Sequence, residues 1–164
     1  MPTPEPDLSR HRPTDAAASP ATAGGLVVPV VTRAGREPDT TGQSGGATRI
    51  SGVSIQHTPA TRLWFGKVHN DPGYRSVPHH HGAAETGGYV LSGRARIYFG
   101  PQFADYLDMS EGDWVFVPPH LPHVECNLDR NRPLTWMTTR TPDNIVVNLA
   151  DVPDDDLRDW VNRA

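Results

Sequence analysis

The sequence predicts a single all-β domain, a small barrel or sandwich, and three observations lead to this prediction. Short segments rich in Val, Ile, Phe, Tyr and Trp follow one another over most of the chain. Gly and Pro, at 15 and 17 of the 164 residues, separate these segments. Only one segment, near the C-terminus, has a helical pattern, which favours a sandwich or barrel over a sheet with crossover helices.

The expected strands follow one another at short intervals. A turn at Asn70-Asp71-Pro72-Gly73 ends an early strand, Gly100-Pro101 interrupts the chain later, and Glu111-Gly112-Asp113 forms a tight turn. The strands that these turns delimit cover residues 26–31, 50–55, 62–68, 76–81, 88–92, 94–99, 106–109, 114–117, 123–127, 134–140 and 144–149.

The chain divides into four parts. Residues 1–25 are rich in Pro, Thr, Ala and Asp, and we expect a disordered tail because they have little apolar surface to bury. Residues 26–48 are expected to form an extended arm or loop, and residues 49–150 the barrel. In the C-terminal tail, 151–164, a short helix is expected over 154–161, with acidic residues in its first turn.

Composition excludes several classes of function. The formal net charge is -4 and no basic run is present, which disfavours nucleic-acid and membrane partners. No apolar run is long enough to span a bilayer, and the N-terminus lacks the pattern of a secretory signal. Cys126 is the only cysteine, so an intrachain disulfide is impossible, and it is expected to be a buried, inert thiol. We expect a cytoplasmic protein.

Three histidines and one glutamate occur at metal-ligand spacing. His79 and His81 are two residues apart, and on a strand such side chains point to the same face. Glu85 follows after a short turn, and His123 lies on a later strand. Buried imidazoles beside a carboxylate are poorly satisfied without a cation, so this set predicts one divalent transition metal: Fe, Ni, Mn, Cu or Zn.

The two stretches that hold these residues resemble the paired motifs of the cupin superfamily. The first motif is Gly, five residues, His-x-His, three or four residues, Glu, six residues and Gly; it is matched by Gly73, His79, His81 and Glu85, with Gly93 one residue late. The second is matched by Gly112, Pro118, His123 and Asn127, with His120 in place of a turn glycine. Thr86, Tyr89, Val90 and Leu91 also match a run found in uncharacterised single-domain cupins.

The resemblance implies one cupin barrel, that is, a double-stranded β-helix or jelly roll of the RmlC-like kind, and a homodimer. Glu85 has two candidate roles: a fourth metal ligand, or a catalytic base beside a metal held by three histidines. His80 is expected to face away from its neighbours, and His120 to be a solvated turn residue. Three or four protein ligands leave coordination positions open, as catalytic metal sites do.

Strand parity gives candidates for the wall of a substrate cavity. If His79 and His81 point inward, aromatic residues on paired strands are expected to do so too; each of them would serve equally well as a core residue. These candidates are Trp64, Tyr89, Tyr98, Phe116 and Trp136. Arg94 and Arg96 share one face of a strand and are weaker candidates for binding an anion, because strand arginines mostly face solvent.

The ligand pattern resembles that of cupin dioxygenases, including small flavonol-cleaving ones. It implies a metal-dependent dioxygenase or oxidoreductase that acts on a small oxygen-chelating molecule such as an enediol, diketone or flavonol. One alternative is a redox-neutral isomerase, lyase or cyclase in which the metal is a Lewis acid. Another is a non-catalytic protein that binds a small molecule. The motifs do not choose among these.

Overall fold

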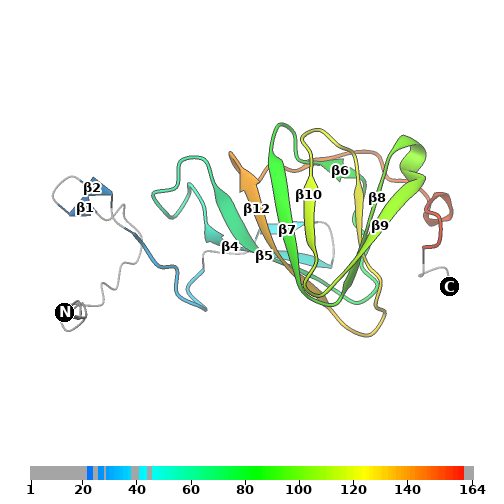
Figure 1. Cartoon of the computed structure of the whole chain (residues 1–164), viewed down its shortest axis with the longest axis horizontal. Coiled ribbons are helices and arrows are strands. Elements are labelled where there is room, and N and C mark those ends of the chain that lie inside the picture. Colours follow the sequence, from blue (N-terminus) through cyan, green and yellow to red (C-terminus); the bar gives the residue numbers. More distant parts are fainter. Residues whose placement is uncertain (1–21, 24–25, 28, 38–40, 44–45, 161–164) are drawn as a thin grey trace, which may run out of the picture.

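The chain is seen here as a computed structural model, which describes residues 22–23, 26–27, 29–37, 41–43 and 46–160 (Figure 1). Over these residues the fold is all-β, as predicted. The strands are β1 (Thr22–Ala23), β2 (Leu26–Val27), β3 (Thr41–Gln43), β4 (Ala47–Val53), β5 (Trp64–Asn70), β6 (His79–His80), β7 (Glu85–Ser92), β8 (Arg94–Phe99), β9 (Asp105–Ser110), β10 (Trp114–Val117), β11 (Val124–Asn127), β12 (Leu134–Thr141) and β13 (Val147–Asn148). Most of the expected disordered tail, 1–25, lies outside the described residues.

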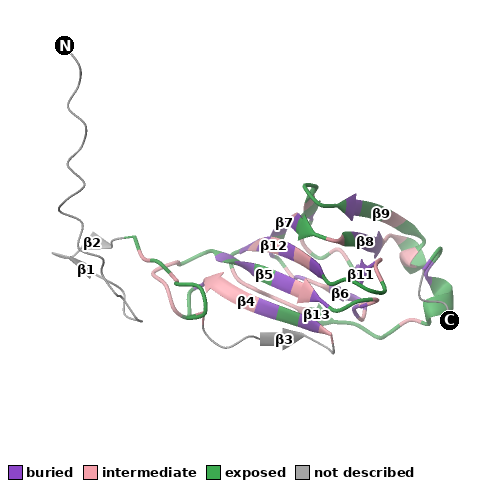
Figure 2. Ribbon diagram, turned by 90° about the horizontal axis from the view of Figure 1, so that it is seen from below, coloured by how far each residue is buried: buried purple, intermediate pink, exposed green. Residues whose placement is uncertain are grey.

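The larger layer is a six-stranded antiparallel sheet with the order β10-β7-β12-β5-β4-β3. Alternation of apolar and polar residues gives each strand one inner and one outer face, and Figure 2 shows buried and exposed residues alternating along β5 and at the start of β4. The pairing aligns Arg49, Val68 and Trp136 in one row on the inner face. Arg140 pairs with Trp64 and Thr86 in another inner row.

The opposite layer joins two smaller sheets. One has the order β11-β8-β9, and the other pairs β13 with β6. A backbone bridge connects them: the amide of His79 donates to the carbonyl of His123 over 3.0 Å, and the amide of His123 donates to the carbonyl of His79 over 2.9 Å. Two segments that are more than 40 residues apart in the sequence are thereby fixed side by side, facing the six-stranded sheet.

The main core fills one part of the space between the layers. It is formed by Val68, Val90, Ala95, Ile97, Met109, Val117, Leu134 and Trp136, which come from six strands of both layers. Apolar side chains from facing sheets pack together in this way in β-sandwiches and small barrels. The remaining interior is polar and contains the histidines described below.

The C-terminal segment differs from the prediction. Instead of a helix over 154–161, the structure shows a single 3-10 turn, Asp154–Asp156, and residues 161–164 lie outside the described part. Three consecutive aspartates are weak helix formers, and Leu157 has extended backbone angles that end the turn. The predicted apolar contacts nevertheless form, because Leu157 and Trp160 pack on Tyr98, Val124 and Cys126.

Among the described residues, no helix has both the length and the apolar character that crossing a membrane requires.

Candidate metal centre

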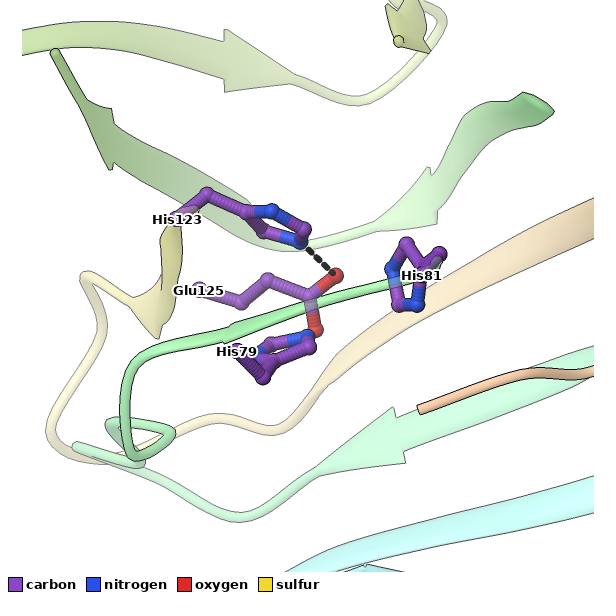
Figure 3. A group of neighbouring side chains, drawn as sticks. All are labelled: His79, His81, His123 and Glu125. Atoms are coloured by element: carbon purple, nitrogen blue, oxygen red, sulfur yellow. Dashed lines mark ion pairs between the residues drawn. The ribbon is translucent and has the colours of Figure 1, made fainter. Parts of the chain in front are cut away.

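Three histidines and a glutamate meet inside the barrel, and Figure 3 shows their rings and carboxylate pointing toward one another. One ligand atom from each of His79, His81, His123 and Glu125 lies within 4.8 Å of those of the others, and all four residues are buried. Two ligands on opposite sides of one ion, each at about 2.1 Å, are about 4.2 Å apart. The spacing therefore suits a single divalent ion after a small contraction.

Backbone carbonyls fix the tautomer of all three histidines. Nδ1 of His79 lies 3.0 Å from the carbonyl oxygen of Val77. Nδ1 of His81 lies 2.9 Å from the carbonyl oxygen of Ile145, and Nδ1 of His123 lies 2.8 Å from that of Leu121. A carbonyl oxygen only accepts hydrogen bonds, so each Nδ1 carries the proton. Each Nε2 therefore offers a lone pair to the centre, as in histidines that ligate metals.

Burial also keeps these histidines neutral. Burial lowers the pKa of His79 from its ordinary value of 6.5 to about 4. The pKa of His81 is lowered to about 2, mainly by burial and also by the positive charge of Arg140. Burial likewise lowers the pKa of His123. A neutral imidazole is the form that binds a metal, so the site is ready for an ion at neutral pH.

Two of the three imidazole lone pairs have no partner in the structure. The Nε2 atoms of His79 and His123 are buried and accept no hydrogen bond. Oε1 of Glu125 lies 3.8 Å from Nε2 of His123 (dashed line in Figure 3), and both atoms are electron-pair donors. Two such atoms repel unless a cation or a proton lies between them, so the residues present fit a divalent metal.

Glu125 points into the centre for the same reason that His79 and His81 do: residues two positions apart on a strand share one face. It lies on β11, two residues after His123, and therefore shares its face. Ser76 holds this strand in place, because its Oγ accepts the amide of Glu125 at 2.9 Å and its own amide donates to the carbonyl of Glu125 at 2.8 Å. Burial acts to raise the pKa of Glu125, but His79, His123 and Arg49 outweigh it, and the carboxyl remains ionised.

The structure corrects the prediction for Glu85. Glu85 is exposed at the start of β7 and does not belong to the cluster. Counting back from Gly93 with the family spacing of six residues leads to Thr86, and Thr86 is the side chain that points inward. A shift of one residue along a strand exchanges the two faces, so Glu85 is neither ligand nor base here. Sequence reasoning could have found Glu125 from its spacing to His123.

Arg140 lies beside the cluster and was not predicted from the sequence. It is 1% exposed, and its guanidinium group contacts Oγ1 of Thr86, Oδ1 of Asn144 and Nε2 of His81, the last at 3.2 Å. The lone pair of His81 can serve either this contact or a metal ion. If an ion takes it, Nη2 of Arg140 remains at the edge of the site, held in place by Thr86 and Asn144.

Only part of the predicted aromatic wall faces the interior. Trp64 and Trp136 are buried on the inner face of the large sheet, and the ring of Trp64 lies 5.5 Å from the guanidinium carbon of Arg140. Tyr89 and Phe116 are on the outer face, where Phe116 is 61% exposed, because their inward neighbours are Val90 and Val117. Their predicted place in the cavity is wrong.

Tyr98 is also outside the cavity. Its ring belongs to a second core beneath the C-terminal segment, and its hydroxyl donates to the carbonyl of Arg158 over 2.8 Å. On β8, Ala95 and Ile97 face the main core, so Tyr98 and Arg96 point to the other side. Arg96 binds Asp108 there and Arg94 is exposed, so neither of them is an anion-binding residue of the centre.

Two other expectations are met. Cys126 is buried in the second core, and burial raises the pKa of its thiol, as expected for an inert cysteine. His120 is exposed in its turn, as expected. Its φ of +59° is the left-handed conformation that the usual glycine of this turn supplies. Its amide donates to the carbonyl of Gly82 over 2.7 Å and so connects the two motif loops.

Comparison with known proteins supports the same family. Residues 66–139 match the model of the cupin domain. No curated protein matches the chain.

Solved structures share the fold at low identity. An uncharacterised protein with a double-stranded β-helix domain from Klebsiella pneumoniae is 18% identical, with a TM-score of 0.55 over 68% of this chain and 90% of that one. An RmlC-like cupin from Shewanella frigidimarina is 19% identical, with a TM-score of 0.55 over 70% and 92%. KdgF from a Halomonas species is 21% identical, with a TM-score of 0.51 over 63% and 87%.

Oxalate decarboxylase from Bacillus subtilis is 22% identical, with a TM-score of 0.56. The matched region covers 65% of this chain and 29% of the longer oxalate decarboxylase chain. Both motifs, the jelly-roll topology and these similarities agree: residues 66–139 belong to a cupin domain, and its fold is that of RmlC-like cupins.

Proposed function

We propose that this protein is a metal-dependent enzyme that acts on a small organic molecule whose oxygen atoms bind the metal. The observation that carries the proposal is the set of inward-facing, buried Nε2 lone pairs, which are unpartnered at His79 and His123 and lie beside the Glu125 carboxylate. A structural histidine is normally hydrogen-bonded through both nitrogens when it is buried. Here one nitrogen is anchored, and the other is left for a ligand.

The reaction that we place first is oxidation by dioxygen of an enediol, a diketone or a similar chelating substrate. A divalent ion held by His79, His81, His123 and Glu125 would supply dioxygen activation or Lewis-acid polarisation. The protein's own contribution is the orientation of the ligands by backbone carbonyls. Glu125 is also the one carboxylate in the cluster that can take a proton from a bound substrate.

A redox-neutral reaction is the second candidate. Arg140 lies at 3.2 Å from the imidazole of His81, and a buried guanidinium stabilises negative charge that develops on a polarised carbonyl. This role needs no change in the oxidation state of a metal. Isomerase, lyase or cyclase chemistry would use the same geometry.

Metal content tests the centre itself. We expect full-length protein to purify with about one transition-metal ion per chain, and His81→Ala and His123→Ala to lose most of it. His80→Ala is the matched control, because His80 is adjacent but its Nδ1 accepts the amide of Gly82 and lies outside the cluster. The two carboxylates form a second pair: Glu125→Gln is expected to lower the metal content, whereas Glu85→Gln leaves it unchanged. Equal metal content in all five variants would contradict the proposed centre.

Reaction class is tested by loading the metal-free protein separately with Fe(II), Ni(II), Mn(II) and Zn(II). Mn(II) is included because oxalate decarboxylase from Bacillus subtilis, which has a similar fold, has Mn(II) centres. Oxygen uptake with an enediol or flavonol that appears with a redox-active metal and not with Zn(II) supports a dioxygenase. Conversion of substrate with Zn(II) and without oxygen uptake supports the redox-neutral class. A non-catalytic binding protein would bind these compounds and leave them unchanged.

A further inference from the structure

The interior beside the metal centre contains a guanidinium group that forms no ion pair with a described residue. Arg49 lies on β4, faces inward and is 2% exposed. Its Nε and Nη2 atoms are buried and have no hydrogen-bond partner among the described residues. Burying an unpaired charge is costly, so such a group is retained where a partner arrives from outside.

The other buried arginines show what this partner is expected to be. Arg96 uses the same two atoms, Nε and Nη2, to hold the carboxylate of Asp108 at 2.5 and 2.8 Å. Arg140 is satisfied by three side chains. In Arg49 the same two nitrogen atoms, Nε and Nη2, have no carboxylate bonded to them. The planar fork of a guanidinium fits a carboxylate by two parallel hydrogen bonds.

Arg49 shares its interior with the metal centre. Asn70 lies two positions along β5 from the residue paired with Arg49, and its backbone carbonyl oxygen accepts Nδ2 of Asn127 at 3.4 Å. Asn127 is two residues after Glu125 on β11 and shares its face. The inner face that carries Arg49 therefore meets the face that carries Glu125, and a ligand on Arg49 lies close to the centre.

Charge in this part of the barrel is unbalanced. Arg49 and Arg140 are buried cations, and Glu125 is the one buried carboxylate among the described residues. The protein alone thus leaves at least one net positive charge, and a divalent ion would add two more. A low-dielectric interior with this excess favours an anionic ligand.

Two further donors beside Arg49 are also unpaired. The side-chain oxygen of Asn70 accepts the indole N–H of Trp136 at 2.6 Å, which leaves its Nδ2 without an acceptor. Oγ of Ser51, two residues after Arg49 on β4, is buried and has no partner. On the large sheet, Asn70 follows the residue paired with Arg49 by two positions, and so lies on the same inner face. Ser51 pairs with Gly66 and Asn70 pairs with Ala47, so the two donors lie on opposite sides of Arg49. An oxygen-rich anion on Arg49 would satisfy one of them.

We infer that Arg49 is a substrate-binding residue that holds one carboxylate of a small organic acid through Nε and Nη2, while another oxygen of the same molecule faces the histidine cluster. The inference rests on the proposed function and narrows its substrate class. It favours carboxylate-bearing substrates, such as an enediol or oxo acid, over uncharged diketones and flavonols.

Binding of malonate, compared with its neutral analogue malonamide, tests this inference. Titration calorimetry on full-length, Zn(II)-loaded protein is expected to show malonate binding with a Kd at least about tenfold lower than that of malonamide. Arg49→Met is expected to lose about tenfold in affinity for malonate while its affinity for malonamide hardly changes. Arg49→Lys is expected to retain part of the preference, since it keeps the charge but not the fork. Arg94→Met, which removes an exposed arginine, is the control and should bind like the wild type.

A structural role for Arg49 predicts a different pattern. If Arg49 only supports the fold, Arg49→Met lowers the Tm and malonate affinity remains as in the wild type once the folded fraction is accounted for. A substrate-binding role predicts a Tm equal to or above that of the wild type, because an unpaired buried charge has been removed.

Unchanged malonate affinity in a folded Arg49→Met protein with full zinc content would overturn the inference and leave the metal centre standing. Loss of zinc from the wild type itself would instead count against the proposed function.

Discussion

At the scale of single residues, the three metal-facing histidines owe their reactivity to what holds their other nitrogen. Val77, Leu121 and Ile145 contribute carbonyl oxygens, not side chains, so the identity of these residues matters less than the course of the backbone. Two of these carbonyls come from the residue two positions before the histidine. The tautomer is thus built into the local chain path, while burial keeps the rings neutral.

The lowered histidine pKa values predict how the stability of the metal-free protein depends on pH. His79 titrates at about 4 in the folded protein and at about 6.5 when it is unfolded. Between these values the unfolded chain binds more protons, so the free energy of unfolding decreases as the pH falls from about 6.5 to about 4. His79 alone accounts for a decrease of the order of 3 kcal/mol, and His81 acts in the same direction.

Urea denaturation of protein treated with a chelator, at pH 7, 6 and 5, measures this dependence. His79→Gln provides the control, since it removes one titrating group and is expected to flatten the decrease. A free energy of unfolding that stays constant over this range, or the same slope in His79→Gln, would contradict the prediction.

At the scale of elements, the C-terminal segment covers the outer side of the small sheet β11-β8-β9. Leu157 is fully buried and Trp160 is 3% exposed in the second core. Arg96 connects this segment to the sheet, because its Nη1 donates to the carbonyl of Asp159 over 2.9 Å. The segment therefore covers the outer face of β8 and β11, which would otherwise expose Tyr98 and Cys126, although it forms no helix.

Leu157→Ala is expected to lower the free energy of unfolding by about 2–4 kcal/mol, because it leaves a cavity between the segment and β8. Urea denaturation at pH 7 measures the change. Leu149→Ala is the matched control: Leu149 is 38% exposed, and a change below about 0.5 kcal/mol is expected. Similar small changes in both variants would show that the segment adds little to stability.

Most strands were predictable from the sequence, but the helix was not. The strands at 94–99 and 114–117 match the prediction, because a period of two and flanking turn residues are local signals. The C-terminal helix was predicted from an apolar stripe and acidic first turn, yet these residues pack equally well as an extended segment on β8 and β11. Tertiary contacts decided between the two because the intrinsic helix preference of the aspartates is weak.

At the scale of the whole molecule, one outer face of the large sheet is unusually apolar. Trp114 is 79% exposed and Phe116 61% exposed, and the rings of Trp114 and Tyr89 lie 4.5 Å apart on neighbouring strands (β10 and β7 in Figure 1). Exposed aromatic clusters of this kind are typical of protein contact surfaces. The homodimer expected from the sequence stays a prediction, and this face is where we expect the second copy to bind.

Light scattering coupled to size-exclusion chromatography tests the dimer. We expect wild-type protein to have the mass of a dimer, and the double variant Trp114→Ser, Phe116→Ser to have that of a monomer with an unchanged Tm, since both side chains are exposed. Leu107→Ser, on the other sheet and 36% exposed, should remain dimeric. A monomeric wild type, or a double variant that stays dimeric, would disprove the predicted interface.

The sequence by itself determined the barrel and the histidine half of the site, since His79 and His81 share a face through local strand geometry and His123 through its motif. Glu125 also shares the face of His123 through its spacing of two residues. The sequence did not determine the side to which Glu85, Arg49 and Arg140 point, because a shift of one residue in register exchanges the two faces of a strand. Turns and pairings between distant strands set that register, and only the tertiary structure contains them.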